Sequence, residues 1–114
     1  MSSGNIKIMR IQLKAKGFEL TPSLTEFTET KLGSLEKFIK RWDVNDSVII
    51  RIELAKTTQH HHKGNVFYAE ANLDLPHRVL RVEETATDIH AAIETLKDRL
   101  KNELLRVKEK DAEH

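Results

Sequence analysis

The chain has 114 residues, 39% of them hydrophobic, with 19 lysines and arginines against 18 aspartates and glutamates. This length and composition predict one domain with a modest core at residues 6–110, flanked by flexible ends at 1–5 and 111–114. The chain contains no cysteine, which excludes disulfides and thiolate metal sites. We expect no signal peptide, and no apolar run approaches the ~18 residues of a membrane span, so we expect a cytoplasmic protein.

The first strand and the first helix are predicted from alternation and from a capping pattern. A strand is predicted at residues 6–15, where apolar and polar side chains alternate apart from a change of phase between Ile8 and Met9. Thr21 followed by Pro22 is a hydroxyl N-cap with proline at the first helical position. Ser23 with Glu26 is an alternative capping box slightly later in the chain. Either pattern predicts that a helix begins here.

The middle of the chain is predicted to form the rest of that helix and three strands. Apolar side chains recur at helical spacing over Leu24–Trp42, where Gly33 is a weak point costing about 1 kcal/mol relative to alanine. Alternating strands follow at Ser47–Lys56, Val66–Leu75 and Val79–Glu84. We expect these three to form an antiparallel meander, and the first strand to run parallel to the second if the two are neighbours.

The longest predicted element is an amphipathic helix at Glu84–Lys110, whose apolar side chains fall within about one third of its circumference. The element order is then β-α-β-β-β-α. This order indicates the α+β class, with a four-stranded mixed sheet and two helices packed on one face. The clean alternation of every strand predicts that the other face is open to water.

Basic residues are concentrated in two segments of this nearly neutral chain. Asn5–Lys16 has four basic residues and no acidic one, and Lys97–Lys110 has six basic and three acidic residues. The basic side chains of the last helix flank its apolar stripe, with Lys97, Lys101 and Lys108 on one side and Arg99, Arg106 and Lys110 on the other. Charged residues on a solvated helix face are ordinary, but cations in this number also suit the phosphates of structured RNA.

The run of His60, His61 and His62 invites a metal hypothesis. A zinc site needs three or four ligands that converge from an ordered scaffold, and no cysteine or suitably spaced carboxylate accompanies these histidines. We therefore predict no metal site and no cofactor. The sequence also lacks a glycine-rich phosphate loop, a nucleophile elbow and a zinc-protease motif, so we predict that the protein is not an enzyme and has no small-molecule substrate.

Two stretches carry a family resemblance. The stretch GFELTPSLTEFTETKLGSLEKF matches the pattern G-x-E-L-T-P-x-L, then K-L-x-x-L-E-K, at Gly17, Glu19, Leu20, Thr21, Pro22, Leu24, Lys31, Leu32, Leu35, Glu36 and Lys37. The stretch DIHAAIETLKDRLKNELLRVKEK matches a second pattern at Asp88, Ala92, Ile93, Leu96, Leu100, Leu104, Arg106 and Lys108. Together they resemble the ribosome hibernation promoting factors and ribosome-associated inhibitors, once called sigma-54 modulation proteins.

The resemblance implies a fold similar to double-stranded RNA-binding domains. It also implies a short family member that lodges in the small ribosomal subunit, where messenger and transfer RNA sit, and blocks translation in non-growing cells. Ribosomal RNA would contact basic residues of both helices, and the predicted set is Lys31, Lys37, Arg99, Lys101, Arg106, Lys108 and Lys110. The sequence departs from the family pattern at His90, Asn102 and Leu105.

The predicted partners are thus the small ribosomal subunit and its ribosomal RNA, with no membrane partner and a monomer off the ribosome. Two alternatives stay open. One is a protein-interaction module, in which the open sheet face or the Val107 end of the last helix docks a partner or a second copy. The other is an RNA-binding domain that acts off the ribosome.

Overall fold

The computed structural model describes residues 10–40, 48–58 and 65–112. Its elements are β1 (Arg10–Lys16), α1 (Pro22–Gly33), α2 (Glu36–Ile39), β2 (Ile49–Thr58), β3 (Asn65–Leu75), β4 (Arg78–Ala86) and α3 (Ile89–Ala112). The α+β class and the β-α-β-β-β-α order predicted from the sequence are confirmed, with the first helical region divided into α1 and α2.

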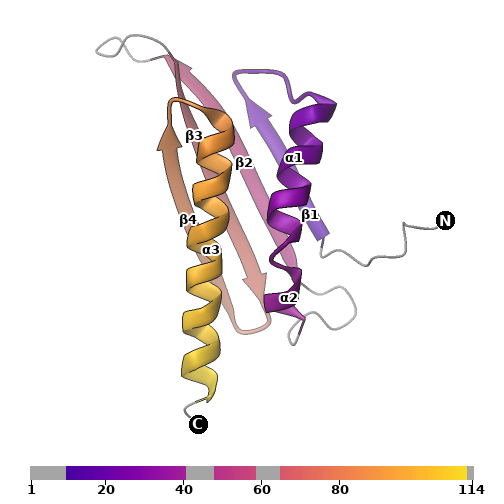
Figure 1. The fold of residues 1–114 in the computed structure, drawn as a ribbon, viewed down its shortest axis with the longest axis vertical. Coiled ribbons are helices and arrows are strands. Elements are labelled where there is room, and N and C mark those ends of the chain that lie inside the picture. The colour runs from indigo at the N-terminus through magenta and orange to yellow at the C-terminus, as the bar shows by residue number, and fades with distance from the viewer. Residues whose placement is uncertain (1–9, 41–47, 59–64, 113–114) are drawn as a thin grey trace, which may run out of the picture.

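The strands form one mixed sheet in the order β1-β2-β3-β4. β1 is parallel to β2, from Arg10 opposite Ile49 to Lys16 opposite Ala55, and the other two pairings are antiparallel. The helices lie on one face of the sheet, with α1 and α3 side by side across it (Figure 1). The described elements leave the second face without a helical cover, as the alternation predicted.

A buried apolar layer joins the sheet to the helices. On β2, the side chains of Ile50, Ile52 and Leu54 are at most 2% exposed, while the residues between them are exposed or half-buried. On α3, Leu96 and Leu100 are fully buried one helical turn apart. Full burial of one such side chain contributes roughly 1.5–3 kcal/mol. This layer fixes the rotation of α3, and therefore decides which of its side chains stay outside.

The turn from β1 into α1 depends on Gly17. Its φ is +83°, and a Cβ atom there would lie 2.6 Å from the backbone carbonyl oxygen of Lys56. The helix then begins as predicted: Thr21 Oγ1 accepts a hydrogen bond from the Leu24 N–H at 3.1 Å, and Pro22 is the first helical residue. The connection thus brings the start of α1 close against β2.

The prediction of one unbroken helix up to Trp42 is wrong within the described residues. α1 ends at Gly33, and the Leu35 N–H donates to the Leu32 carbonyl three residues back, at 3.0 Å, before the short α2 begins. The tighter turn occurs at the glycine that was the weak point of the pattern. Trp42 and the run His60–His62 lie outside the described residues.

The predicted start of the last helix is also wrong. β4 continues to Ala86, which pairs with Phe67, so α3 begins at Ile89 and not near Glu84. Asp88 precedes the helix, and its carboxylate accepts the His90 N–H at 3.2 Å. A carboxylate here satisfies a free amide of the first helical turn, so the strand and the helix meet with almost no loop between them.

Candidate nucleic-acid interface

Helix α3 presents different side chains on the two flanks of its buried stripe. One flank faces α1 and α2, where the His90 ring packs edge-on against Phe27 with 4.6 Å between centroids, and Lys101 lies over Phe38. The other flank faces the sheet edge, where Arg99 reaches β4. The predicted RNA-binding residues are therefore sorted between two flanks and do not form one cluster.

Lys37 and Lys101 come together on one aromatic ring. The Nζ atom of Lys37 lies 5.3 Å from the centroid of Phe38, and that of Lys101 lies 5.5 Å from it. Both lysines are exposed, and within the described residues neither forms an ion pair. A cation over an exposed ring gains only about 0.5–1 kcal/mol, which orients the ammonium group without neutralising it. We call Lys37, Phe38 and Lys101 the α2–α3 seam.

Lys31 lies between α1 and α3, but its charge is compensated. Its Nζ is 2.8 Å from the Glu94 carboxylate and 5.5 Å from the centroid of Phe27. The hydrogen bond from Lys31 is the main cause that holds the pKa of Glu94 below its ordinary value. Lys97 lies 3.7 Å from Glu94 and 3.3 Å from Asp98. Ion pairs thus join the two helices here, and they offset most of the positive charge.

Arg99 is bound to the end of β4. Its Nη1 donates to the Glu83 carbonyl oxygen at 2.8 Å and to the Glu84 carboxylate at 3.0 Å. These groups and the neighbouring Tyr68 and Thr85 line a depression of about 220 Å³. Although 53% of the Arg99 side chain is exposed, its donors are directed at β4. This residue anchors α3 to the sheet edge, a role that the sequence did not predict.

The three remaining predicted residues, Arg106, Lys108 and Lys110, occupy the last turns of α3. The Arg106 side chain is 69% exposed and lies 3.6 Å from a carboxylate one turn earlier. By helical spacing, Arg106 and Lys110 share the flank of Arg99, whereas Lys108 shares the flank of Lys101. Lys108 therefore extends the seam towards the C-terminal end of α3.

Phe38 is the site residue that sequence reasoning missed. Its position in the helical stripe predicted a core residue, but the ring is half-buried and supports both seam lysines. The available signal was its place directly after Lys37 on the predicted helix. The described residues contain no group of three or more histidines and carboxylates that could hold a metal ion. In the same residues, no helix is long and apolar enough to cross a membrane.

The sequence and the fold both have known relatives. A family model described as sigma 54 modulation protein / S30EA ribosomal protein matches residues 11–112. The chain is 28% identical over 106 residues to a ribosome hibernation promoting factor from Klebsiella oxytoca, covering 93% of this chain and 100% of that protein. It is similar in structure to the N-terminal domain of Protein Y from Thermus thermophilus, with a TM-score of 0.71 and 27% identity, covering 87% of this chain and 99% of the other.

A ribosomal subunit interface protein from Coxiella burnetii shares the fold, with a TM-score of 0.66 and 22% identity, over 88% of this chain and 98% of that one. The family model spans every helix and all but the first residue of the described sheet. It also contains both stretches, 17–38 and 88–110, on which the resemblance rested. The chain belongs to the sigma 54 modulation protein / S30EA ribosomal protein family.

Proposed function

We propose that this chain is a cytoplasmic hibernation factor that binds the small ribosomal subunit in the region of messenger and transfer RNA, and thereby inhibits translation. The names of its relatives support this role, since one is a ribosome hibernation promoting factor and another a ribosomal subunit interface protein. The observation that carries the proposal is the α2–α3 seam, where two exposed lysines share the Phe38 ring and form no ion pair with any residue that the structure describes.

In this proposal the α2–α3 seam binds RNA and catalyses no reaction. Lys37, Lys101 and Lys108 neutralise phosphates of ribosomal RNA, which releases condensed counterions and makes the affinity fall with salt. Folded RNA presents its shape and backbone to such a surface, so no sequence code is needed. Inhibition follows from occupancy, because a domain seated there excludes messenger and transfer RNA from the same space.

The predicted RNA contacts differ in how free each side chain is to reach a phosphate. Lys37, Lys101 and Lys108 are the principal contacts, because all three are exposed: Lys101 and Lys108 lie on the flank of α3 that faces α2, and Lys37 lies on α2 itself. Lys31 contributes less, since it must give up Glu94 to reach a phosphate. Arg106 and Lys110 make peripheral contacts on the other flank. Arg99 acts mainly by holding α3 against β4.

Charge reversal at the seam tests the proposal. The variant K37E/K101E should lose co-sedimentation with small subunits in sucrose gradients, because it replaces two phosphate contacts by two repulsions. The matched control R10E/K14E makes the same change on the opposite face and should still sediment with the subunits. The two circular-dichroism melting curves show whether each variant folds.

Three results would contradict the proposal in different ways. Retention of K37E/K101E on the subunit would reject the seam. Equal affinity of the wild-type chain for generic duplex RNA and for small subunits would indicate an RNA-binding domain that acts off the ribosome. Absence from the ribosome, together with concentration-dependent self-association, would indicate a protein-interaction module.

A further inference from the structure

The open face of the sheet carries an ordered set of ion pairs. Lys16 pairs with Glu53 at 2.9 Å on the β1 side. In the middle, the Nη1 and Nη2 atoms of Arg51 both contact the Asp74 carboxylate, and the Nη2 contact is 2.9 Å long. On the β4 side, Arg81 lies 3.1 Å from Glu70 and 2.7 Å from Glu83. Every carboxylate of the described open face thus has a basic partner.

Two cations of the described open face have no carboxylate partner there, and both lie on β1. Arg10 and Lys14 point to the open face together with Gln12, since these positions are exposed and alternate with half-buried ones. Within residues 10–40, 48–58 and 65–112, neither Arg10 nor Lys14 forms an ion pair. β1 is also an edge strand, paired only with β2. The unbalanced positive charge of this face is therefore concentrated along one strand.

The same face is poorly suited to a protein partner. Its only exposed large hydrophobic residue in the described chain is Val79, which is 58% exposed and lies on β4, at the far edge from β1. Stable protein interfaces have an apolar core, whereas interfaces with nucleic acid are polar and strongly positive on the protein side. Lysine on an edge strand also discourages strand pairing, but that does not account for Arg10 and Gln12 on the same line.

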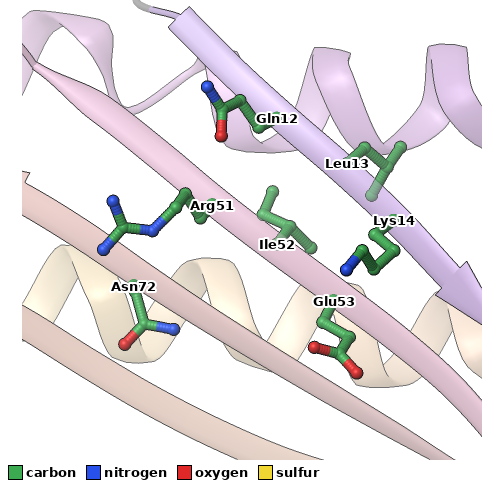
Figure 2. A pocket seen from close by; sticks show the side chains of 7 residues that line it. All are labelled: Gln12, Leu13, Lys14, Arg51, Ile52, Glu53 and Asn72. Atoms are coloured by element: carbon green, nitrogen blue, oxygen red, sulfur yellow. The ribbon is translucent and has the colours of Figure 1, made fainter.

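A cavity of about 340 Å³ adjoins these cations (Figure 2). Gln12, Arg51 and Asn72 are cross-strand neighbours, and their polar ends lie in one row across three strands. Amide groups can read the edge of a base, and a guanidinium plane can stack on its face. Lys14 and Glu53 form the next row, and the charge of Glu53 is offset by its pair with Lys16.

The spacing along β1 suits contacts to two phosphates of one strand. Arg10 and Lys14 are separated by four residues of an extended strand, about 13 Å, so they can hold phosphates of different nucleotides while a base between these phosphates turns towards the sheet. We propose that β1 and the adjoining cavity bind single-stranded RNA on the face opposite the helices. Arg10 and Lys14 hold phosphates, and a base between them enters the space lined by Gln12, Arg51 and Asn72. This site goes beyond the proposed function, which uses the α2–α3 seam.

Fluorescence anisotropy with a labelled oligouridylate of about ten nucleotides tests the site, using the full chain over about 50–200 mM salt. R10E/K14E should weaken binding about tenfold or more, and should lower the slope of log affinity against log salt by about 1.4, or 0.7 for each lost phosphate contact. K37E/K101E, which is expected to lose the ribosome, changes the net charge by the same amount as R10E/K14E, and should weaken oligonucleotide binding several-fold less than R10E/K14E does. The two sites therefore fail independently of each other.

The contact between a base and the cavity can be measured separately from the phosphate contacts. An abasic oligomer of the same length should bind several-fold more weakly than oligouridylate to the wild-type chain, with the same salt slope, because only the base contact is missing. Gln12→Ala should reduce that difference. The neutral variant R10Q/K14Q repeats the phosphate test if charge reversal prevents folding.

Several outcomes would overturn the inference. These are wild-type affinity of R10E/K14E for the oligonucleotide, an equal loss in K37E/K101E, or no binding by the wild-type chain at the lowest salt. A dimer in sedimentation equilibrium that R10E/K14E abolishes, without oligonucleotide binding, would show that the face pairs with a second copy of the chain.

Discussion

Arg99 and Lys101 are two residues apart on α3, but the structure gives them opposite roles. Arg99 donates to the Glu83 carbonyl and the Glu84 carboxylate, whereas Lys101 lies over Phe38 and has no ion pair in the described chain. Helical spacing separated the two flanks correctly. Whether a cation on a flank meets a carboxylate depends on which residues the folded sheet places beside it. The sequence therefore predicted which basic residues lie on each flank of α3, but not which of them are free of carboxylate partners in the described chain.

Replacing Arg99 by alanine should lower the free energy of unfolding by about 1 kcal/mol, because a half-exposed ion pair and a hydrogen bond to a backbone carbonyl are lost. Urea denaturation measures the change. Arg106→Ala is the matched control, since its only ion pair in the described chain is a 3.6 Å contact within α3, and it should shift stability by less than about 0.5 kcal/mol. Equal stabilities of the two variants would remove the anchoring role of Arg99.

Glu70 gives a pH-dependent prediction. Its carboxylate accepts hydrogen bonds from Asn72 at 3.0 Å and Tyr68 at 2.9 Å, and it pairs with Arg81. These contacts, led by Asn72, hold the pKa of Glu70 below its ordinary value. The resulting stabilisation is complete above the pKa of an unfolded glutamate, and is lost as the pH falls through the lower folded pKa.

Carbon-detected NMR should therefore titrate Glu70 with a lower midpoint in the folded chain than in the urea-unfolded chain. Asn72→Ala should raise the folded midpoint, because the leading hydrogen bond to the carboxylate is lost. A midpoint that does not move in this variant would assign the lowered pKa to Tyr68 and Arg81 instead.

At the scale of elements, the periodicity of the sequence correctly predicted those features of the strands and helices that depend on which side chains are buried. The alternation of β2 and the apolar stripe of α3 were right, because each period records which side chains leave water. The wrong boundaries lie where pairing between elements decides. β4 continues to Ala86 because Phe67 is available opposite it, and α1 ends at Gly33 in a turn that the helical pattern does not encode.

Gly17, in the turn between β1 and α1, and Gly33, the last residue of α1, give a matched pair of substitutions. Gly17→Ala should destabilise the chain by about 1 kcal/mol or more, because the residue has a positive φ and its Cβ would lie 2.6 Å from the Lys56 carbonyl oxygen. Gly33→Ala, at the helix terminus without a positive φ, should be neutral or stabilising by up to about 1 kcal/mol. Thermal melting measures both, and an equal loss of stability in the two variants would contradict the strain assigned to Gly17.

The whole molecule has two unlike surfaces. One is the helical layer on one side of the sheet (Figure 1), which includes the α2–α3 seam, and the other is the face of the sheet that carries the ion pairs. Their exposed large hydrophobic residues in the described chain are Leu105, 41% exposed on α3, and Val79, 58% exposed on β4. They belong to different layers, so residues 10–40, 48–58 and 65–112 offer no broad apolar patch for self-association.

We therefore expect a monomer in solution. Sedimentation equilibrium should return about the chain mass of 13.2 kDa over a wide concentration range. Leu105→Lys should leave that mass unchanged, because an isolated exposed leucine does not make an interface. A dimer that this substitution dissociates would identify the outer side of α3 as a contact between copies.

The parallel pairing of β1 with β2 also has a consequence for the order of folding. β2, β3, β4 and α3 follow one another along residues 49–112 and meet through short-range hairpins, whereas Arg10 must find Ile49 across both other helices. Closing that longer loop costs more chain entropy. We expect β1 to dock late and to exchange its amide hydrogens sooner than β3, so the strand that carries Arg10 and Lys14 would also be the first to detach.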